Sequence, residues 1–325
     1  MDKKHYSMFG YFEDNVDYLH FITTDNFNYS TYYLPESYER LTFGDEFNCT
    51  LDSLSSLLTH LYFGYSFNQF VDNLPLTLLV LEFGYSFNQP INNLPLNLVE
   101  LVLGYSFNQS IDTLPSEIKK LVLGHSFNLA INDLPSQIKF IKFEYTFNQI
   151  LHCFPITLET IILSSNFNQL IYFSQTQISN LKHLVFGCAF NQPINYLPNS
   201  LIKLEFGNMF DNNINLPINL TYLKFGNNFN CKINELPQQL THLILGSFYE
   251  HPINKFPISL THFTFGNSYN GLLNNLPETI QFIHLPPNYE TKVDIISKNQ
   301  LTIRCHNTYY FSTNLNKKYK FEYYN

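Results

Sequence analysis

The sequence predicts a β-rich solenoid, in which repeats of about 20 residues stack so that one short strand from each joins a parallel β-sheet. Three observations carry this prediction. A Phe-Asn pair recurs with a strict period of 20 residues from Phe27 to Phe167. A short apolar alternation precedes this pair in most repeats, and a Leu-Pro pair follows it. Because proline forbids a long helix on the return limb, we expect little helix.

Each repeat reads approximately L-x-[F/L]-G-x-x-F-N-Q-x-I-x-x-L-P-x-x-L-x-x, as in LEFGYSFNQPINNLPLNLVE at 81–100. The alternating triplet at its start predicts a strand with two residues facing the core and one facing solvent. The glycine after the triplet is expected to supply a backbone conformation that other residues avoid. After the proline, the limb is expected to be extended or to form a single tight turn. One such unit cannot bury its apolar edge alone, so the repeats must stack.

The Phe-Asn pair is the most specific part of the repeat. Stacked repeats would bring the Phe side chains into a continuous spine of rings. The Asn side chains are expected to be buried and to satisfy backbone groups at the turn, as a hydrogen-bonded ladder. A ligand-binding role for these amides is the less favoured alternative, since a repeated buried amide is usually structural. The clearest members of the ladder are Phe87, Asn88, Phe107, Asn108, Phe127 and Asn128.

The motif FNQPI at 87–91 and again at 190–194, with Leu-Pro in most repeats, resembles the FNIP repeat, a relative of the leucine-rich repeat. The resemblance spans about residues 18–290 in about thirteen copies. It implies a leucine-rich-repeat-like stack, and an origin in social amoebae or in giant DNA viruses that infect amoebae. Several relatives carry an N-terminal F-box that recruits a ubiquitin ligase. Residues 1–17 are too few for its three helices, so we expect no F-box here and do not carry over a ubiquitin-ligase role.

We expect three segments along the chain. An open parallel sheet invites edge-to-edge aggregation, so its ends need caps. The expected segments are an N-terminal cap at 1–17, the repeat solenoid at 18–290, and a C-terminal cap and tail at 291–325. Within the solenoid, SQTQISN at 174–180 lacks the proline and is interpreted as a bulged outer limb, with a binding loop as the alternative.

Composition and charge narrow the possible partners and locations. A formal net charge of −8 and a pI near 5.7 argue against nucleic-acid binding, which normally needs a basic face. No apolar run suits a signal peptide or a membrane span, which predicts a non-secreted cytoplasmic protein without membrane contact. Five cysteines without a CxxC pair suggest reduced intracellular thiols. The oligomeric state is left open.

No catalytic or metal-ligating constellation stands out in the sequence, so we expect neither enzyme activity nor a cofactor or metal. One possible exception is His242 and His262, which occupy the same position in adjacent repeats, with His284 two positions further along the next strand. Adjacent parallel strands would bring the first two imidazoles within reach of one metal ion. Exposed histidines on a polar sheet face are the favoured interpretation, because no carboxylate is placed as a third ligand.

The candidate binding site is a file of aromatic residues one position after the turn glycine. In leucine-rich repeats this position lies at the rim of the sheet and points to solvent, so the rings would form an exposed ridge of a type enriched at interfaces. The alternative is that neighbouring rings only pack on one another. Small polar residues take over in the later repeats. The members of the file are Tyr65, Tyr85, Tyr105, His125 and Tyr145.

The leading hypothesis for function is a non-enzymatic protein–protein interaction module that binds a protein partner through its parallel-sheet face and this tyrosine rim. The outward strand positions vary between repeats although the core positions do not, as a recognition surface would. One alternative is a carbohydrate- or small-ligand-binding solenoid. Another is a member of an expanded repeat family without a dedicated partner.

Overall fold

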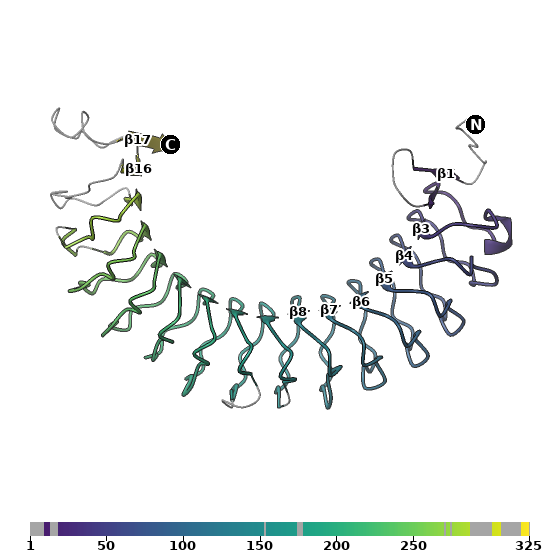
Figure 1. Cartoon of the computed structure of the whole chain (residues 1–325), viewed down its shortest axis with the longest axis horizontal. Coiled ribbons are helices and arrows are strands. Elements are labelled where there is room, and N and C mark those ends of the chain that lie inside the picture. The colour runs from purple at the N-terminus through teal and green to yellow at the C-terminus, as the bar shows by residue number, and fades with distance from the viewer. Residues whose placement is uncertain are drawn as a thin grey trace. The chain divides into compact units, whose positions relative to one another are not determined.

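The computed structural model describes residues 10–13, 19–152, 154–173, 178–269, 271–273, 275–286, 301–306 and 320–324. The chain forms two compact units, Met1–Ser164 and Ser165–Asn325. In each unit the repeats follow one another in chain order, each contributing a strand and a looped outer limb (Figure 1). The expected boundaries between caps and solenoid fall outside the described residues, as do residues 174–177, so the three-segment division is still a proposal.

The first unit contains nine strands and one short 3-10 helix, η1 (Thr31–Tyr33), among its described residues. β1 pairs antiparallel with β2, and from β2 to β9 every neighbouring pair is parallel. The strands are β1 (Gly10–Phe12), β2 (His20–Thr23), β3 (Arg40–Thr42), β4 (His60–Tyr62), β5 (Val80–Glu82), β6 (Glu100–Val102), β7 (Lys120–Leu123), β8 (Phe140–Phe143) and β9 (Thr160–Ile162).

The second unit contributes eight described strands, and each neighbouring pair is parallel. The register joins the same position of each repeat, for example Leu223 to Leu243 and Leu243 to Phe263. The strands are β10 (His183–Val185), β11 (Lys203–Glu205), β12 (Tyr222–Lys224), β13 (His242–Ile244), β14 (His262–Thr264), β15 (Phe282–His284), β16 (Thr302–His306) and β17 (Lys320–Tyr324).

The core of each unit is the expected spine of rings. Phe87, Phe107 and Phe127 are fully buried, with ring centroids 6.1 and 6.3 Å apart and planes within 12° of parallel. The same stacking continues in the second unit, where Phe229 and Tyr249 lie 5.8 Å apart. A second layer comes from the strands, because Phe83 stacks on Phe87 at 3.6 Å. Burying a phenylalanine or tyrosine ring at this position in successive repeats gives each repeat its share of a continuous apolar core.

The outer limb ends in a single tight turn, as the recurring proline predicts. The backbone N–H of Leu78 donates to the carbonyl of Pro75 at 3.1 Å, and the same turn recurs at Leu98 and Pro95. The Thr77 hydroxyl donates to the carbonyl of Leu58 in the preceding repeat at 2.7 Å. Because the limbs end in single turns, η1 is the one helical segment in the described part of the first unit. The predicted parallel-sheet solenoid of about 13 turns with almost no helix is confirmed.

The turn glycine has a different role from the one expected. None of the turn glycines at 44, 64, 84, 104, 124, 207, 226, 246 and 266 adopts the left-handed backbone conformation. Instead, successive turns approach so closely that a Cβ on Gly104 would lie 1.6 Å from the carbonyl oxygen of Gly84, and a Cβ on Gly84 would lie 2.0 Å from that of Gly64. Glycine is therefore required here because one backbone passes directly against the next.

Candidate interaction site

The five residues Tyr65, Tyr85, Tyr105, His125 and Tyr145, which we call the rim file, form one continuous stack in the first unit. Their ring centroids are 4.5, 4.3, 4.0 and 4.6 Å apart in chain order, and neighbouring planes lie within 15° of parallel. The register of the parallel sheet explains the stack, because it places each position beside the same position of the next repeat.

The rim file presents ring edges and hydroxyl groups to solvent, while the faces of its inner rings are covered by their neighbours. Tyr65 and Tyr145 are 51% and 48% exposed, and Tyr85 and Tyr105 are each 40% exposed. His125 is half-buried, and its Nδ1 is buried without a hydrogen-bond partner among the described residues. The file therefore combines a rigid apolar body with polar tips, a combination common in protein interfaces.

In the second unit, polar residues occupy the repeat position that the rim file occupies in the first unit. The Ser247 hydroxyl donates to Oδ1 of Asn227 at 3.2 Å, and the backbone N–H of Asn227 donates to Oδ1 of Asn208. Short side chains that bond to the next turn replace the stacked rings. The repeat fold thus forms with or without the aromatic residues at this position.

Beside the rim file, the asparagine of each Phe-Asn pair bridges to the next repeat. Oδ1 of Asn88 accepts the backbone N–H of Asn108 at 2.8 Å, and Oδ1 of Asn108 accepts that of Asn128 at 3.0 Å. Gln109 also donates its Nε2 to Asn88 at 3.2 Å. The expectation that these amides are buried is wrong, because Asn88 and Asn128 are half-buried and Asn108 is exposed. The turn that carries them lies at the surface, where one side of the ladder meets water.

A second file of rings lies on the outward face of the sheet in the second unit. His242 and His262 are adjacent in the register, with centroids 4.2 Å apart and planes 10° from parallel. Tyr222 stacks on His242 at 5.7 Å, and Phe282 stacks on His262 at 5.8 Å. We call these four residues the face file. The period of about 20 residues already places Tyr222 at the repeat position of His242 and His262, and the same spacing would have revealed Phe282.

The geometry of the two histidines does not suit a shared metal ion. A metal ion would lie about 2.0–2.1 Å from a nitrogen of each ring, in the plane of that ring, because the imidazole lone pair lies in the plane. Two nearly parallel rings with centroids 4.2 Å apart cannot both direct a lone pair at one such position. Within the described ranges, no group of three or more His, Cys, Asp or Glu side chains is placed to hold a metal. Burial lowers the pKa of both histidines below the usual value of 6.5, and His262 lowers that of His242 further by charge repulsion.

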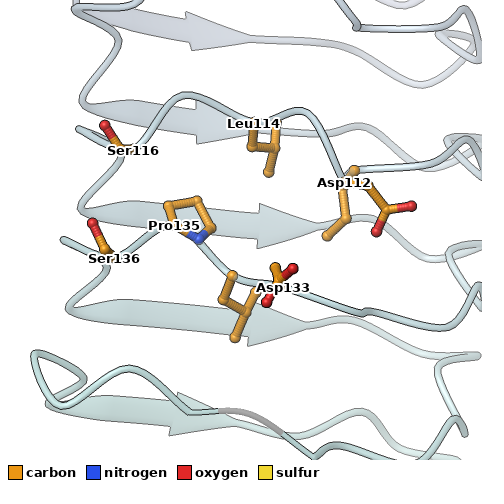
Figure 2. Close-up of a pocket in the computed structure, with 8 residues that line it drawn as sticks. Asp112, Leu114, Ser116, Asp133, Pro135 and Ser136 are labelled. Carbon is orange, nitrogen blue, oxygen red and sulfur yellow. The ribbon is translucent and has the colours of Figure 1, made fainter.

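A shallow cavity of about 200 Å³ lies between two successive outer limbs of the first unit. In Figure 2, the carboxylates of Asp112 and Asp133 stand toward one end, and the hydroxyls of Ser116 and Ser136 stand toward the other. The Asp112 carboxylate already accepts hydrogen bonds from Ser110 at 2.9 Å and from the Nδ2 of a neighbouring asparagine at 3.3 Å. Pockets that hold small molecules are usually larger, about 300–1,000 Å³.

The stacked repeats, parallel sheet and rim positions define the class of protein as a leucine-rich-repeat-like solenoid. The model of the FNIP Repeat family matches residues 50–86, 107–146, 179–209 and 210–248. These segments include four of the five rim-file positions and part of the face file. The chain is thus an FNIP-repeat protein.

Several solved chains are similar to this chain, among them CroV588 and YopM. CroV588, described as a novel circular LRR protein and coming from a giant virus, is 37% identical with a TM-score of 0.76. The match covers 84% of this chain and spans 44% of the length of CroV588. YopM from Yersinia enterocolitica is 18% identical with a TM-score of 0.43, over 87% of this chain and 77% of YopM. No curated protein sequence gives a significant match. In the described part of the chain, no helical segment has the length and apolar character of a membrane span.

Proposed function

We propose that the chain is a non-enzymatic protein-interaction module, which binds a protein partner through the outward face of its parallel sheet and through the rim file. Repeat scaffolds of this kind commonly mediate protein interactions. The observation that supports this proposal most is the rim file itself: five stacked rings whose half-exposed edges and hydroxyls form a rigid ridge. Preordered tyrosine side chains lose little conformational entropy when a partner binds.

The arrangement of the rings favours a protein over a carbohydrate. An aromatic platform for sugars offers its ring faces, whereas the inner faces of the rim file are occupied by neighbouring rings at 4.0–4.6 Å. Ring edges and hydroxyl groups suit the mixed apolar and polar surface of a protein segment. A glycan array tests the alternative directly, and a defined glycan ligand lost on Tyr85→Ala would favour it.

Protein capture with matched variants tests the main proposal. Wild-type protein, the double variant Tyr85→Ala/Tyr105→Ala and a control double variant Tyr32→Ala/Tyr172→Ala would be immobilised and exposed to cell lysate, followed by mass spectrometry. The control residues are 79% and 64% exposed and lie outside the rim file. We expect a protein that the wild type and the control capture, and that the rim variant binds at least about tenfold more weakly.

Two further results decide between the remaining explanations. Tyr85→Phe/Tyr105→Phe keeps the stack and removes only the hydroxyls, so it reports whether the polar tips contribute to binding. Capture that is equal in the rim and control variants would move the site away from the rim file, to the outward strand positions. If no protein is captured above background by the wild type, the alternative without a dedicated partner is favoured.

A further inference from the structure

The two histidines of the face file share a hydrogen-bonding arrangement that the sequence pattern alone does not reveal. The Thr241 hydroxyl donates its hydrogen to the carbonyl of Thr221 at 2.9 Å, and the Thr261 hydroxyl donates to the carbonyl of Thr241 at 3.0 Å. Each of these hydroxyl oxygens also lies 2.9 Å from Nδ1 of the following histidine, His242 or His262.

These contacts engage one nitrogen of each ring and leave the other for a partner. When the imidazole is protonated, Nδ1–H donates to the threonine oxygen, whose own hydrogen goes to the carbonyl of the preceding repeat. The second donor of each protonated ring is then Nε2–H. Neither Nε2 of His242 nor that of His262 has a hydrogen-bond partner among the described residues. Two neighbouring rings thus hold one open nitrogen each, with centroids 4.2 Å apart.

The surface around this pair is cationic although the chain is acidic. On the outward positions of β11–β16, the charged side chains are Lys203, Lys224 and Arg304 against the single carboxylate Glu205, a net charge of +2, whereas the whole chain carries −8. Glu205 is already engaged by Lys203 at 2.7 Å and by Lys224 at 3.4 Å. Lys203 also lies 5.0 Å from the ring centroid of Tyr222.

We propose that the outward face of β11–β16 binds an acidic segment of a partner protein, with a carboxylate of that segment accepting hydrogen bonds from protonated Nε2 of His242 and of His262. This inference rests on the proposed function and names the chemistry of the partner. Charge complementarity supports it, because the local +2 face attracts a short acidic segment. A long polyanion such as nucleic acid would also meet the repulsion of an acidic chain.

The same chemistry makes binding depend on pH. In the free protein, burial holds the pKa of both histidines below 6.5, and their mutual repulsion lowers that of His242 further. The other titratable or charged groups on this face are Lys203, Glu205, Tyr222, Lys224, His284 and Arg304. A bound carboxylate favours the charged imidazoles and raises their pKa, so protons are taken up on binding. Affinity therefore increases as pH falls from about 7.5 to about 5.5, above the range in which glutamate itself becomes protonated.

A labelled peptide tests the proposal on the full chain. The probe is a fluorescein-labelled peptide of alternating glutamate and serine, and its control replaces each glutamate with glutamine. Fluorescence anisotropy at low salt would give Kd at about pH 5.5 and about pH 7.5. We expect the glutamate peptide to bind more tightly at the lower pH, by up to about tenfold for each imidazole whose pKa rises by one unit. The glutamine peptide is expected to bind weakly at both pH values.

Two histidine variants separate this face from a general charge effect. His242→Gln/His262→Gln should abolish the pH response. His60→Gln is the matched control in the first unit: Nδ1 of His60 lies 2.8 Å from the Thr59 hydroxyl, which donates to the Glu39 carbonyl at 3.0 Å, and burial also lowers its pKa. This control should behave as wild type. A pH response that persists in the double histidine variant would overturn the proposal, as would an equal response to an oligothymidylate of the same charge.

Calorimetry provides a second measurement that needs no variant. Titrating the peptide into wild-type protein in two buffers with different ionisation heats counts the protons taken up. We expect net uptake, and zero uptake would contradict the proposal. If the glutamate peptide does not bind but protein capture still depends on the rim file, only this inference is wrong. If neither the peptide nor any protein binds, the proposed function is wrong as well.

Discussion

Replacing the turn glycine Gly104 with alanine tests the close approach of successive turns. The backbone of Gly104 is not in the left-handed region, so alanine meets no conformational penalty there. If backbone conformation alone mattered, the substitution would stabilise the protein by about 0.4–1 kcal/mol, through a less flexible unfolded chain. The observed contacts predict the opposite sign.

The magnitude follows from the distance that the new methyl group needs. Its carbon would lie 1.6 Å from the carbonyl oxygen of Gly84, so the two turns must separate by about 1.8 Å to reach ordinary contact near 3.4 Å. Two nearby hydrogen bonds join these repeats, from Phe83 N–H to the Val102 carbonyl and from Ser106 N–H to the Tyr85 carbonyl, each 2.9 Å long. Losing both costs about 2 kcal/mol. With the strain of overpacking, we expect a total loss of roughly 3–4 kcal/mol.

Urea unfolding followed by far-ultraviolet circular dichroism would measure the change in the free energy of unfolding. Ser106→Ala is the matched control, because Ser106 belongs to the same turn and its hydroxyl makes no hydrogen bond within the described ranges. The control should stay within about 0.5 kcal/mol of wild type. A Gly104→Ala variant that is as stable as wild type, or more stable, would refute the close-approach explanation.

Three further outcomes are expected. Asn88→Ala leaves the N–H of Asn108 without its 2.8 Å partner and should lower the free energy of unfolding by about 1 kcal/mol, because water reaches this half-buried ladder; an unchanged urea midpoint would contradict it. Phe107→Ala empties a fully buried place in the spine and should cost about 3–5 kcal/mol in the same assay. Burial lowers the pKa of four histidines below 6.5, namely His60, His242, His262 and His284. The unfolded chain therefore binds more protons than the folded one, and the melting temperature should fall as pH decreases from about 7 through that range. Replacing all four histidines with glutamine should flatten this dependence.

The sequence by itself determined the repeat, the strand positions and the neighbours of each side chain within a unit. In an in-register parallel stack, position i lies beside its equivalent in the next repeat, so a period of about 20 residues already places Tyr85 next to Tyr105 and His242 next to His262. The same reasoning identified the buried phenylalanine spine, because an apolar residue repeated at one position needs a common core.

Only the tertiary structure decided how closely the turns approach and which atoms face water. The distance between Gly84 and Gly104 depends on the path of two backbones, which no residue pattern specifies. The exposure of Asn108 depends on where the turn emerges from the core. The contact of His242 Nδ1 with the Thr241 hydroxyl, which itself meets a carbonyl of the preceding repeat, depends on how the two repeats are spaced. Such features follow from distances of a few ångströms between repeats, because hydrogen bonds and steric contacts change sharply over that range.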